Sequence, residues 1–305
     1  ATMNVREVQS DLANNHGRRV ARSFIQNLSE HVGAIAFTKE ESWEYEVGSL
    51  DDEVVTVGLS LDGAMIPTVD SGYREAMVGA ISLYNEEGER LHSIYIGEAP
   101  EYGKARFKER YHREIERIRK GYPHAQYLGI ADGAKDNWSF LEPYTSRQLL
   151  DYFHAAEYLP QIAQAAYPGK TDKPKRKQWL REWRHKLKHQ SGAADEIIEL
   201  SKGYARKRSL TKTVREQLDA AITYFGNNRH RMNYPEHLKA NLPIGSGVTE
   251  AACKTLVKQR LCGSGMRWKE QGVKVVLSLR ALVQTPGRWE SYWQKIQQFG
   301  VPAFV

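Results

Sequence analysis

The sequence contains very little cysteine and no long apolar run. Only Cys253 and Cys262 occur in 305 residues, which is too few for a disulfide scaffold, and they lack the spacing of a metal site. No stretch approaches the roughly 18 uninterrupted apolar residues of a membrane span. The N-terminal residues do not resemble a signal sequence. These absences predict a reduced, cytoplasmic protein that does not enter a membrane.

Internal repeats and low-complexity blocks are also absent. Hydrophobic residues make up 41% of the chain and aromatic residues 10%, which is enough for a sizeable core and excludes wholesale disorder. A length of 305 residues predicts about two domains, or one core that carries a large insertion.

Basic residues are concentrated in one part of the chain. The net charge is +7, yet residues 170–215 hold 15 Lys and Arg against five acidic residues, a net charge of +10. The remainder therefore carries −3. Localised basicity of this kind indicates a polyanionic partner, most often nucleic acid. A solvated helix surface is the alternative.

Residues 1–48 are expected to form an N-terminal helical region. Two apolar stripes at helical spacing predict two short helices separated by a turn that ends at Gly17. The first stripe is Val5, Val8 and Leu12, and the second is Val20, Phe24, Leu28 and Val32. The pair fits a helix-turn-helix that reads a DNA major groove and fits a plain helical hairpin packed on the core equally well.

The rest of the chain predicts an α/β core with a large helical insertion. Residues 49–166 alternate apolar runs with two helical stretches, over 102–121 and about 153–166, which is typical of a mixed sheet. Residues 167–243 are polar, basic and helical in pattern, and residues 244–305 return to the core with C-terminal helices. The expected strands are 54–61, 76–84, 91–96, 127–131 and 148–150.

Two of these strands are expected to end in an Asp-Gly pair. Asp62 follows the first strand and Asp132 follows the strand at 127–131. Ligands gather at the carboxyl ends of strands in α/β sheets. Two neighbouring carboxylates repel each other unless a cation lies between them, and Mg²⁺ suits oxygen ligands. Simple turn chemistry, in which each Asp bonds only its own backbone, is the alternative.

Glu250 strengthens the first interpretation. It lies just inside a helix predicted after 243–249, where Ser246 or Thr249 would serve as the cap. A first-turn glutamate also suits the helix dipole, which is its structural alternative. Lys254 and Lys258 follow on the same helix and would bind phosphates beside a metal site.

Six motifs occur in one order over residues 5–295, and together they resemble the DDE transposases of bacterial insertion sequences. The resemblance is to the Kra-type group, which is related to the Mutator-like transposases. The motifs are Gly72-Tyr73-Arg74-Glu75-Ala76-Met77-Val78-Gly79, Pro100-Glu101-Tyr102-Gly103-Lys104, Ala131-Asp132-Gly133-Ala134-Lys135, Asp151-Tyr152-Phe153-His154-Ala155-Ala156-Glu157-Tyr158-Leu159, Gly245-Ser246-Gly247-Val248-Thr249-Glu250 and Ser264-Gly265-Met266-Arg267-Trp268.

The resemblance implies a ribonuclease-H-like core that is interrupted by a helical insertion before its last acidic residue. It also implies a catalytic triad of Asp62, Asp132 and Glu250, and an Asp-x-x-His motif at Asp151 to His154. His154 would bond a scissile phosphate or orient a metal-bound water; a capping Asp and a partly buried His are the alternative. Family members commonly carry more sequence at the N-terminus, so we expect a processed or truncated form.

The implied activity is metal-dependent DNA transposition. Two Mg²⁺ ions, or Mn²⁺ in their place, would allow one site first to hydrolyse the transposon end and then to join the freed 3′-hydroxyl to target DNA. Asp62 would bridge both ions. The partners would be terminal repeats and target DNA, bound by a homodimer at the nucleoid, with no small-molecule substrate. A ribonuclease-H-like nuclease or resolvase without strand transfer, and a domesticated DNA-binding protein, are the alternatives.

Other side chains are expected to hold the DNA or to line the site. Trp179 and Trp183 recur at helical spacing, which favours core packing over an aromatic wedge. Trp138 follows Asp132 closely and either lines the site or packs on the sheet. The expected DNA contacts are Lys175, Arg176, Lys177, Arg181, Arg184, Lys254, Lys258 and Arg267.

Overall fold

The computed structural model describes residues 3–40, 42–207 and 209–300. The chain divides into two compact units. The first comprises Ala1–Asn85, Glu89–Ala125 and Gly247–Val305, and the second comprises Glu86–Gly88 and Gln126–Ser246. The predicted insertion at 167–243 lies within the second unit, which begins earlier in the chain, at the strand before Asp132.

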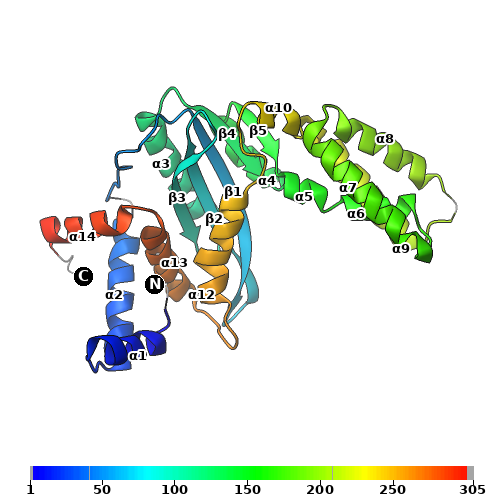
Figure 1. Cartoon of the computed structure of the whole chain (residues 1–305). Helices are drawn as coiled ribbons and strands as arrows, with labels where there is room; N and C mark the ends of the chain where they lie inside the picture. Colours follow the sequence, from blue (N-terminus) through cyan, green and yellow to red (C-terminus); the bar gives the residue numbers. More distant parts are fainter. Residues whose placement is uncertain (1–2, 41, 208, 301–305) are drawn as a thin grey trace. The chain divides into compact units, whose positions relative to one another are not determined.

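The first unit holds three long strands and most of the C-terminal helices (Figure 1). Its elements are α1 (Val5–His16), α2 (Arg22–Lys39), β1 (Thr56–Thr68), β2 (Gly72–Tyr84), β3 (Arg90–Glu98), α3 (Ala105–Gly121), α11 (Gly247–Ala252), η4 (Cys253–Lys258), α12 (Gln259–Leu261), α13 (Glu270–Gln284) and α14 (Arg288–Phe299).

Strands β1, β2 and β3 pair antiparallel in the order β3-β2-β1. The register sets Asp62 opposite Val78, and pairing continues to Thr68 opposite Gly72. Strand β1 is therefore seven residues longer at its carboxyl end than the sequence predicted. Side chains alternate between the two faces of the sheet along each strand.

The two faces of this sheet are covered by different helices (Figure 1). A Cβ at Gly79 would meet Phe107 and Tyr111 of α3, whereas a Cβ at Gly97 would meet Leu277 of α13. On the α13 face, Ala64 and Ile66 pack with Ala76, Val78 and residues of α11, η4 and α13 in one buried cluster. Because residues two apart share a face, Ser60 and Asp62 also point to the α13 side.

The N-terminal helices form as predicted, but α2 buries a different face. Phe24 and Leu28 are 58% and 52% exposed, so the expected stripe is wrong. Helix α2 instead packs on α13 through Ile25, Gly33, Ile35 and Ala36. A Cβ at Gly33 would overlap the Val275 side chain, so the glycine permits this close approach. Gly17 ends α1 with a φ of 62°, as expected of a glycine cap.

The second unit holds two parallel strands and a set of helices (Figure 1). Its elements are β4 (Gln126–Ala131), α4 (Lys135–Leu141), η1 (Glu142–Tyr144), β5 (Arg147–Leu150), α5 (Tyr152–Ala156), α6 (Leu159–Ala166), η2 (Lys170–Asp172), α7 (Lys173–His189), α8 (Ala193–Ala205), α9 (Lys212–Asn228), η3 (Arg229–Arg231) and α10 (Tyr234–Lys239).

Helices α6 to α9 pack together as a bundle. Trp179 and Trp183 of α7 are buried, and their rings lie 5.6 Å apart. The prediction that they belong to the core is confirmed. The expected single helix over 153–166 is wrong, because Pro160 falls in the first turn of a new helix, α6. Proline lacks the N–H that a continuing helix needs there.

The protein is thus of mixed α/β type, with antiparallel pairing in the first unit and parallel pairing in the second. Among the residues that the structure describes, no helix is both long and apolar enough to cross a membrane.

Candidate catalytic site

Asp62 lies in the middle of β1 and not at the end of a strand. The sequence suggested an end because Gly63 follows directly and Asp-Gly pairs are common in turns. The hairpin instead continues past this pair, since Gly63 lies where the Glu75 side chain crosses the sheet and leaves no room for a Cβ. The expectation that Asp62 marks the carboxyl end of a strand is wrong. Its side chain is placed by strand alternation, on the face that α11, η4 and α13 cover.

The Asp62 carboxylate contacts the backbone of the next residue and a thiol from η4. Oδ1 accepts a hydrogen bond of 2.7 Å from the N–H of Gly63. The thiol of Cys253 lies 3.8 Å from Oδ2 and donates toward it. The bond to the backbone is the turn-like contact that the alternative interpretation expected, and the thiol contact is a long-range one from η4.

Glu250 lies on α11, which packs against β1 and β2. The residue before it, Thr249, is fully buried and its hydroxyl is hydrogen-bonded to the hydroxyl of Ser60. This bond ties the first turn of α11 to β1 two residues before Asp62. Thr249 therefore anchors the helix to the sheet, a role that the sequence did not suggest. Glu250 itself is exposed.

Cys253 is the residue of η4 that contacts Asp62. It lies one turn after Glu250, and burial, then the neighbouring Asp62 and finally Glu250 raise the pKa of its thiol to about 12. The thiol therefore stays protonated at neutral pH and donates to Asp62. A thiolate would favour soft metals, whereas the carboxylate of Asp62 beside a neutral thiol offers oxygen atoms, which suit hard cations. No pattern in the sequence pointed to this residue.

The helix that carries Glu250 changes to a π-helical turn at η4. Such turns add one residue to a helix and leave backbone carbonyls without their usual partners. The guanidinium of Arg280, on α13, donates to the carbonyl oxygens of Leu256, at 2.8 Å, and Thr255. Arg280 is 3% exposed, so a buried charge from another helix stabilises the turn.

An open hollow of about 650 Å³ borders Glu250. Lys254, Lys258 and Gln259 line it with Gly247 and Ala251. The structure thus brings three of the predicted residues, Glu250 and both lysines, to one surface. A carboxylate beside two ammonium groups can hold a cation and the phosphate that the cation neutralises.

Asp132 belongs to the second unit and follows β4 directly, as predicted. Its Oδ1 accepts bonds of 3.1 Å from the N–H of Ala134 and from the amide of Asn137. Its own carbonyl accepts a 2.7 Å bond from the hydroxyl of Tyr224. Gly133, at a φ of 102°, turns the chain away from the strand. The side chain is thereby held in one orientation by turn bonds.

Asp151 and His154 lie at the same edge, because β4 and β5 are parallel and Ala131 pairs with Leu150. Asp151 is buried, and its Oδ1 accepts the N–H groups of Phe153 and His154 at the start of α5. Its Oδ2 accepts both the N–H and the hydroxyl of Ser246. Asp151 is therefore a capping residue that also binds a distant loop, as the alternative interpretation expected.

His154 is partly exposed. Its Nδ1 lies 3.8 Å from Glu157 on the next turn, and its side chain is 37% exposed. It shares the edge of the parallel strands with Asp132. The structure thus leaves it able to reach a ligand at that edge.

The predicted basic residues of α7 differ in how free they are. Arg176 donates to the carbonyl oxygens of Tyr167 and Gly169, at 2.7 and 2.9 Å, so it holds the start of the helix. Lys175 is paired with Asp172 at 3.3 Å. Three others, which lie on one side of the helix at spacings of four and three residues, are exposed: Lys177, Arg181 and Arg184.

Arg267 does not lie near Asp62. Its neighbour Trp268 pairs with the end of β1, accepting from Val69 and donating to Pro67 through the backbone. Pro67 lies five positions after Asp62 along the strand, a distance of about 17 Å. Arg267 is exposed at that far end of the hairpin.

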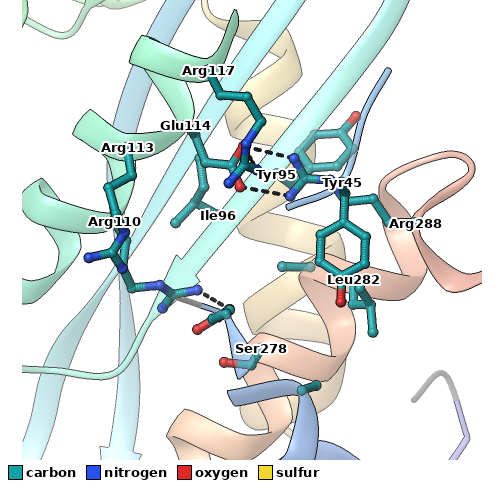
Figure 2. Close-up of a pocket in the computed structure, with 13 residues that line it drawn as sticks. Tyr45, Tyr95, Ile96, Arg110, Arg113, Glu114, Arg117, Ser278, Leu282 and Arg288 are labelled. Carbon is teal, nitrogen blue, oxygen red and sulfur yellow. Dashed lines mark hydrogen bonds and ion pairs between the residues drawn. The ribbon is translucent and has the colours of Figure 1, made fainter. Parts of the chain in front are cut away.

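A small closed cavity of about 40 Å³ lies elsewhere in the first unit (Figure 2). Arg288 binds Glu114 through two hydrogen bonds, of 3.0 and 2.8 Å, on one side of it. Arg110 binds both Glu98 and Glu40 on another. The cavity has room for a few waters only. These ion pairs join α2, β3 and α3 to the segment that starts α14, so we assign them a structural role.

Within the described residues, no group of three or more His, Cys, Asp or Glu side chains lies close enough together to hold a metal ion. In the first unit, α11, which carries Glu250, packs against β1, which carries Asp62; in the second, Asp132 and His154 follow two neighbouring parallel strands. A scan against protein-family models finds no match, and a search of curated proteins finds none.

Proposed function

We propose that the protein is a DDE-type DNA transposase with a ribonuclease-H-like core. In this proposal Asp62, Glu250 and Asp132 supply the carboxylates for two divalent cations, Mg²⁺ or Mn²⁺. The observation that carries the proposal is the arrangement around Cys253. Cys253, one turn after Glu250, contacts Asp62, and Thr249, the residue before Glu250, is hydrogen-bonded to Ser60 two residues before Asp62 on β1.

Two further features support it. Asp132 is fixed at the carboxyl end of a parallel strand, where ligands of α/β proteins gather. The order of the six sequence motifs matches the same family.

The bound cations would activate water or a 3′-hydroxyl and would neutralise the phosphate that is attacked. The residues of the chain hold and orient these groups. The thiol of Cys253 and the N–H of Gly63 fix the rotamer of Asp62. Thr249 and Ser60 fix the height of Glu250 above the sheet.

Lys254 and Lys258 would bind the phosphates on either side of the reacting one. They line the hollow beside Glu250, and phosphate contacts position a DNA strand without reading its sequence. His154 would donate to a phosphate oxygen from the edge that it shares with Asp132. No covalent intermediate with the protein is required.

The test uses the DNA that flanks the protein's own gene. A duplex with that end, pre-cut to expose its 3′-hydroxyl, is mixed with a supercoiled plasmid and Mg²⁺, and joined products are measured on a gel. We expect joining by the wild-type protein and none by Asp62→Asn or Glu250→Gln. Asp70→Asn, which changes an exposed carboxylate in the turn between β1 and β2, is the matched control and should remain active.

Cleavage without joining would replace the proposal by a nuclease of the same fold. Binding without cleavage or joining in either metal would replace it by a DNA-binding protein without catalysis. Full activity of Asp62→Asn would show that the carboxylates around Cys253 are not the site.

A further inference from the structure

A second hollow, of about 650 Å³, lies in the second unit directly after Asp132. It begins at Gly133, and its wall includes Lys135, Trp138, Tyr158 and residues of α9 and η3. We call it the Gly133 pocket. Its volume falls within the range of small-ligand sites. The roles assigned so far do not use it.

The wall of the Gly133 pocket is aromatic and firmly held. Tyr158 and Tyr224 stack with ring centroids 4.0 Å apart, and the Tyr224 hydroxyl donates to the carbonyl of Asp132. Asn228 donates to the carbonyl of Tyr224. A Cβ at Gly133 would crowd Tyr224 and Asn228 at 3.2 and 3.3 Å. The residue after the proposed catalytic aspartate is thus a glycine that makes room for this wall.

Cationic groups complete the Gly133 pocket. The guanidinium of Arg231 lies 4.4 Å from the ring centre of Trp138, and its Nε donates to the neutral side chain of Gln148. Burial lowers the pKa of Arg231, so water solvates this charge incompletely. Within the described residues neither Arg231 nor Lys135 forms an ion pair. Trp138 is 95% buried, and its indole N–H has no hydrogen-bond partner in the part of the chain that the structure describes.

The groups in the Gly133 pocket suit an unpaired nucleotide. They are aromatic rings, a guanidinium, an ammonium and an indole N–H that lacks a hydrogen bond among the described residues. Bases that are not paired stack on aromatic and guanidinium groups, and their phosphates bind Arg and Lys. The pocket also contains Asp219, whose carboxylate can accept from the amino group of a base. A base within a duplex offers no free face, so the base must leave the stack.

We propose that the Gly133 pocket binds one unpaired nucleotide of the DNA that is processed at Asp132. The base lies against the Tyr158, Tyr224 and Trp138 wall, and the phosphate lies between Lys135 and Arg231. The inference rests on the proposed function only in taking DNA as the ligand. An unpaired nucleotide held there would fix the strand next to the reacting phosphate.

The test is a binding measurement that needs no catalysis. Two labelled duplexes of equal length are compared with the full chain in EDTA by fluorescence anisotropy; one carries a single unpaired 2-aminopurine and the other is fully paired. We expect about tenfold tighter binding of the first duplex, because stacking of one base contributes on that scale. The 2-aminopurine fluorescence should fall on binding, because the base stacks on protein rings.

Variants locate the effect. Thr223→Trp fills the Gly133 pocket from an exposed position on α9, and Thr213→Trp is the matched control on the first turn of the same helix. Lys135→Gln removes an exposed pocket cation, and Lys202→Gln removes an exposed cation that is paired with Glu199 outside it. The preference for the unpaired base should disappear in the two pocket variants and persist in both controls.

Equal binding of the two duplexes by the wild-type protein would overturn the inference, and so would a preference that survives in Thr223→Trp. If a free deoxynucleoside monophosphate at micromolar concentration displaces the duplex with the unpaired base, the ligand of the pocket is a free nucleotide and not DNA. The result is independent of joining activity. If the preference for the unpaired base is present but no joining occurs, the transposase proposal is refuted and the nucleotide-binding role of the Gly133 pocket stands. If joining occurs without that preference, the pocket proposal is refuted and the transposase proposal stands.

Discussion

At the scale of single residues, Asp62 and Asp132 carry the same group and are held in different ways. Asp132 is fixed by a local turn that Asp, Gly and Asn at short spacing predict. The orientation of Asp62 depends on a thiol 191 residues away in the sequence. Local chemistry could therefore be predicted from the sequence, whereas the contacts with Cys253 and Thr249 required the fold.

We expect Asp132→Asn to bind end DNA as tightly as the wild-type protein, within about twofold, and to lose cleavage by at least about a thousandfold. Asparagine keeps an oxygen for the N–H of Ala134 but loses the charge that holds a cation. Gel shift and cleavage assays measure the two effects. Asp195→Asn, an exposed change in the same unit, should affect neither. Equal loss of binding and cleavage would make Asp132 a structural residue.

The two cysteines should differ in reactivity. Burial and Asp62 keep the Cys253 thiol protonated, and only a thiolate reacts with iodoacetamide. Cys262 is exposed. We expect alkylation of Cys262 at pH 8 at least about a hundredfold faster than that of Cys253, measured by mass spectrometry of peptides. Unfolding in urea should make the two rates equal. Rapid labelling of Cys253 in the folded protein would contradict its burial beside Asp62.

At the scale of elements, β1 and α2 show what periodicity can and cannot predict. The strand was expected to end at Asp62 because an Asp-Gly pair is typical of turns. A glycine that accommodates a neighbouring side chain does not interrupt this one. The predicted buried face of α2 was wrong because Gly33 allows α13 to approach closely, and this contact determines which face is buried. Close approach between distant helices is not encoded in local spacing.

Helix α7 should bind DNA through one face. We expect the triple change Lys177→Ala, Arg181→Ala and Arg184→Ala to make the salt dependence of DNA binding shallower by up to about 2.7 in log-log slope, because each phosphate contact contributes about 0.9. The loss should be the same for end DNA and unrelated DNA. The matched control replaces Lys202 and Lys212, which are exposed on α8 and α9 and paired with Glu199 and Glu216. An unchanged slope would make α7 a solvated surface only.

Arg176 and Lys175 are left out of that test for a physical reason. Arg176 donates to two carbonyl oxygens at the start of α7, so its removal would lower stability as well as charge. The sequence identified the basic cluster correctly but could not separate residues that hold the helix from residues that face solvent.

At the scale of the whole molecule, the charged cavity in Figure 2 makes stability depend on pH. Burial raises the pKa of Glu40 from 4.5 to about 7, despite the opposing charge of Arg110. Between these values the folded chain binds a proton that the unfolded chain releases, so the free energy of unfolding falls as pH rises. The contribution of this group has a slope of at most about 1.4 kcal/mol per pH unit.

We expect this slope to be missing in Glu40→Gln. Urea unfolding of the wild type and the variant between pH 4.5 and 7.5 measures the difference. The two curves of unfolding free energy should diverge through that range and run parallel above about pH 8, where Glu40 is ionised in both states. Glu44→Gln changes an exposed carboxylate close by in the sequence and should follow the wild type. Parallel curves throughout would contradict the raised pKa.

The π-helical turn at η4 sets the two ends of one helix at different rotational phases. Thr249 faces the core at the start of this helix. In an uninterrupted α-helix, Arg260 would lie about 20° around the helix axis from Thr249, so Arg260 would face the core at the other end. The additional residue in the π-helical turn rotates the following residues by about 100° around the helix axis. As a result, Leu261 is buried, and Arg260 lies over the ring of Trp268. A chain lacking one residue between 254 and 258 would aim a charge into the core. The length of this short segment is therefore constrained as strongly as its composition, and a deletion there could be tolerated only together with an apolar residue at the position of Arg260.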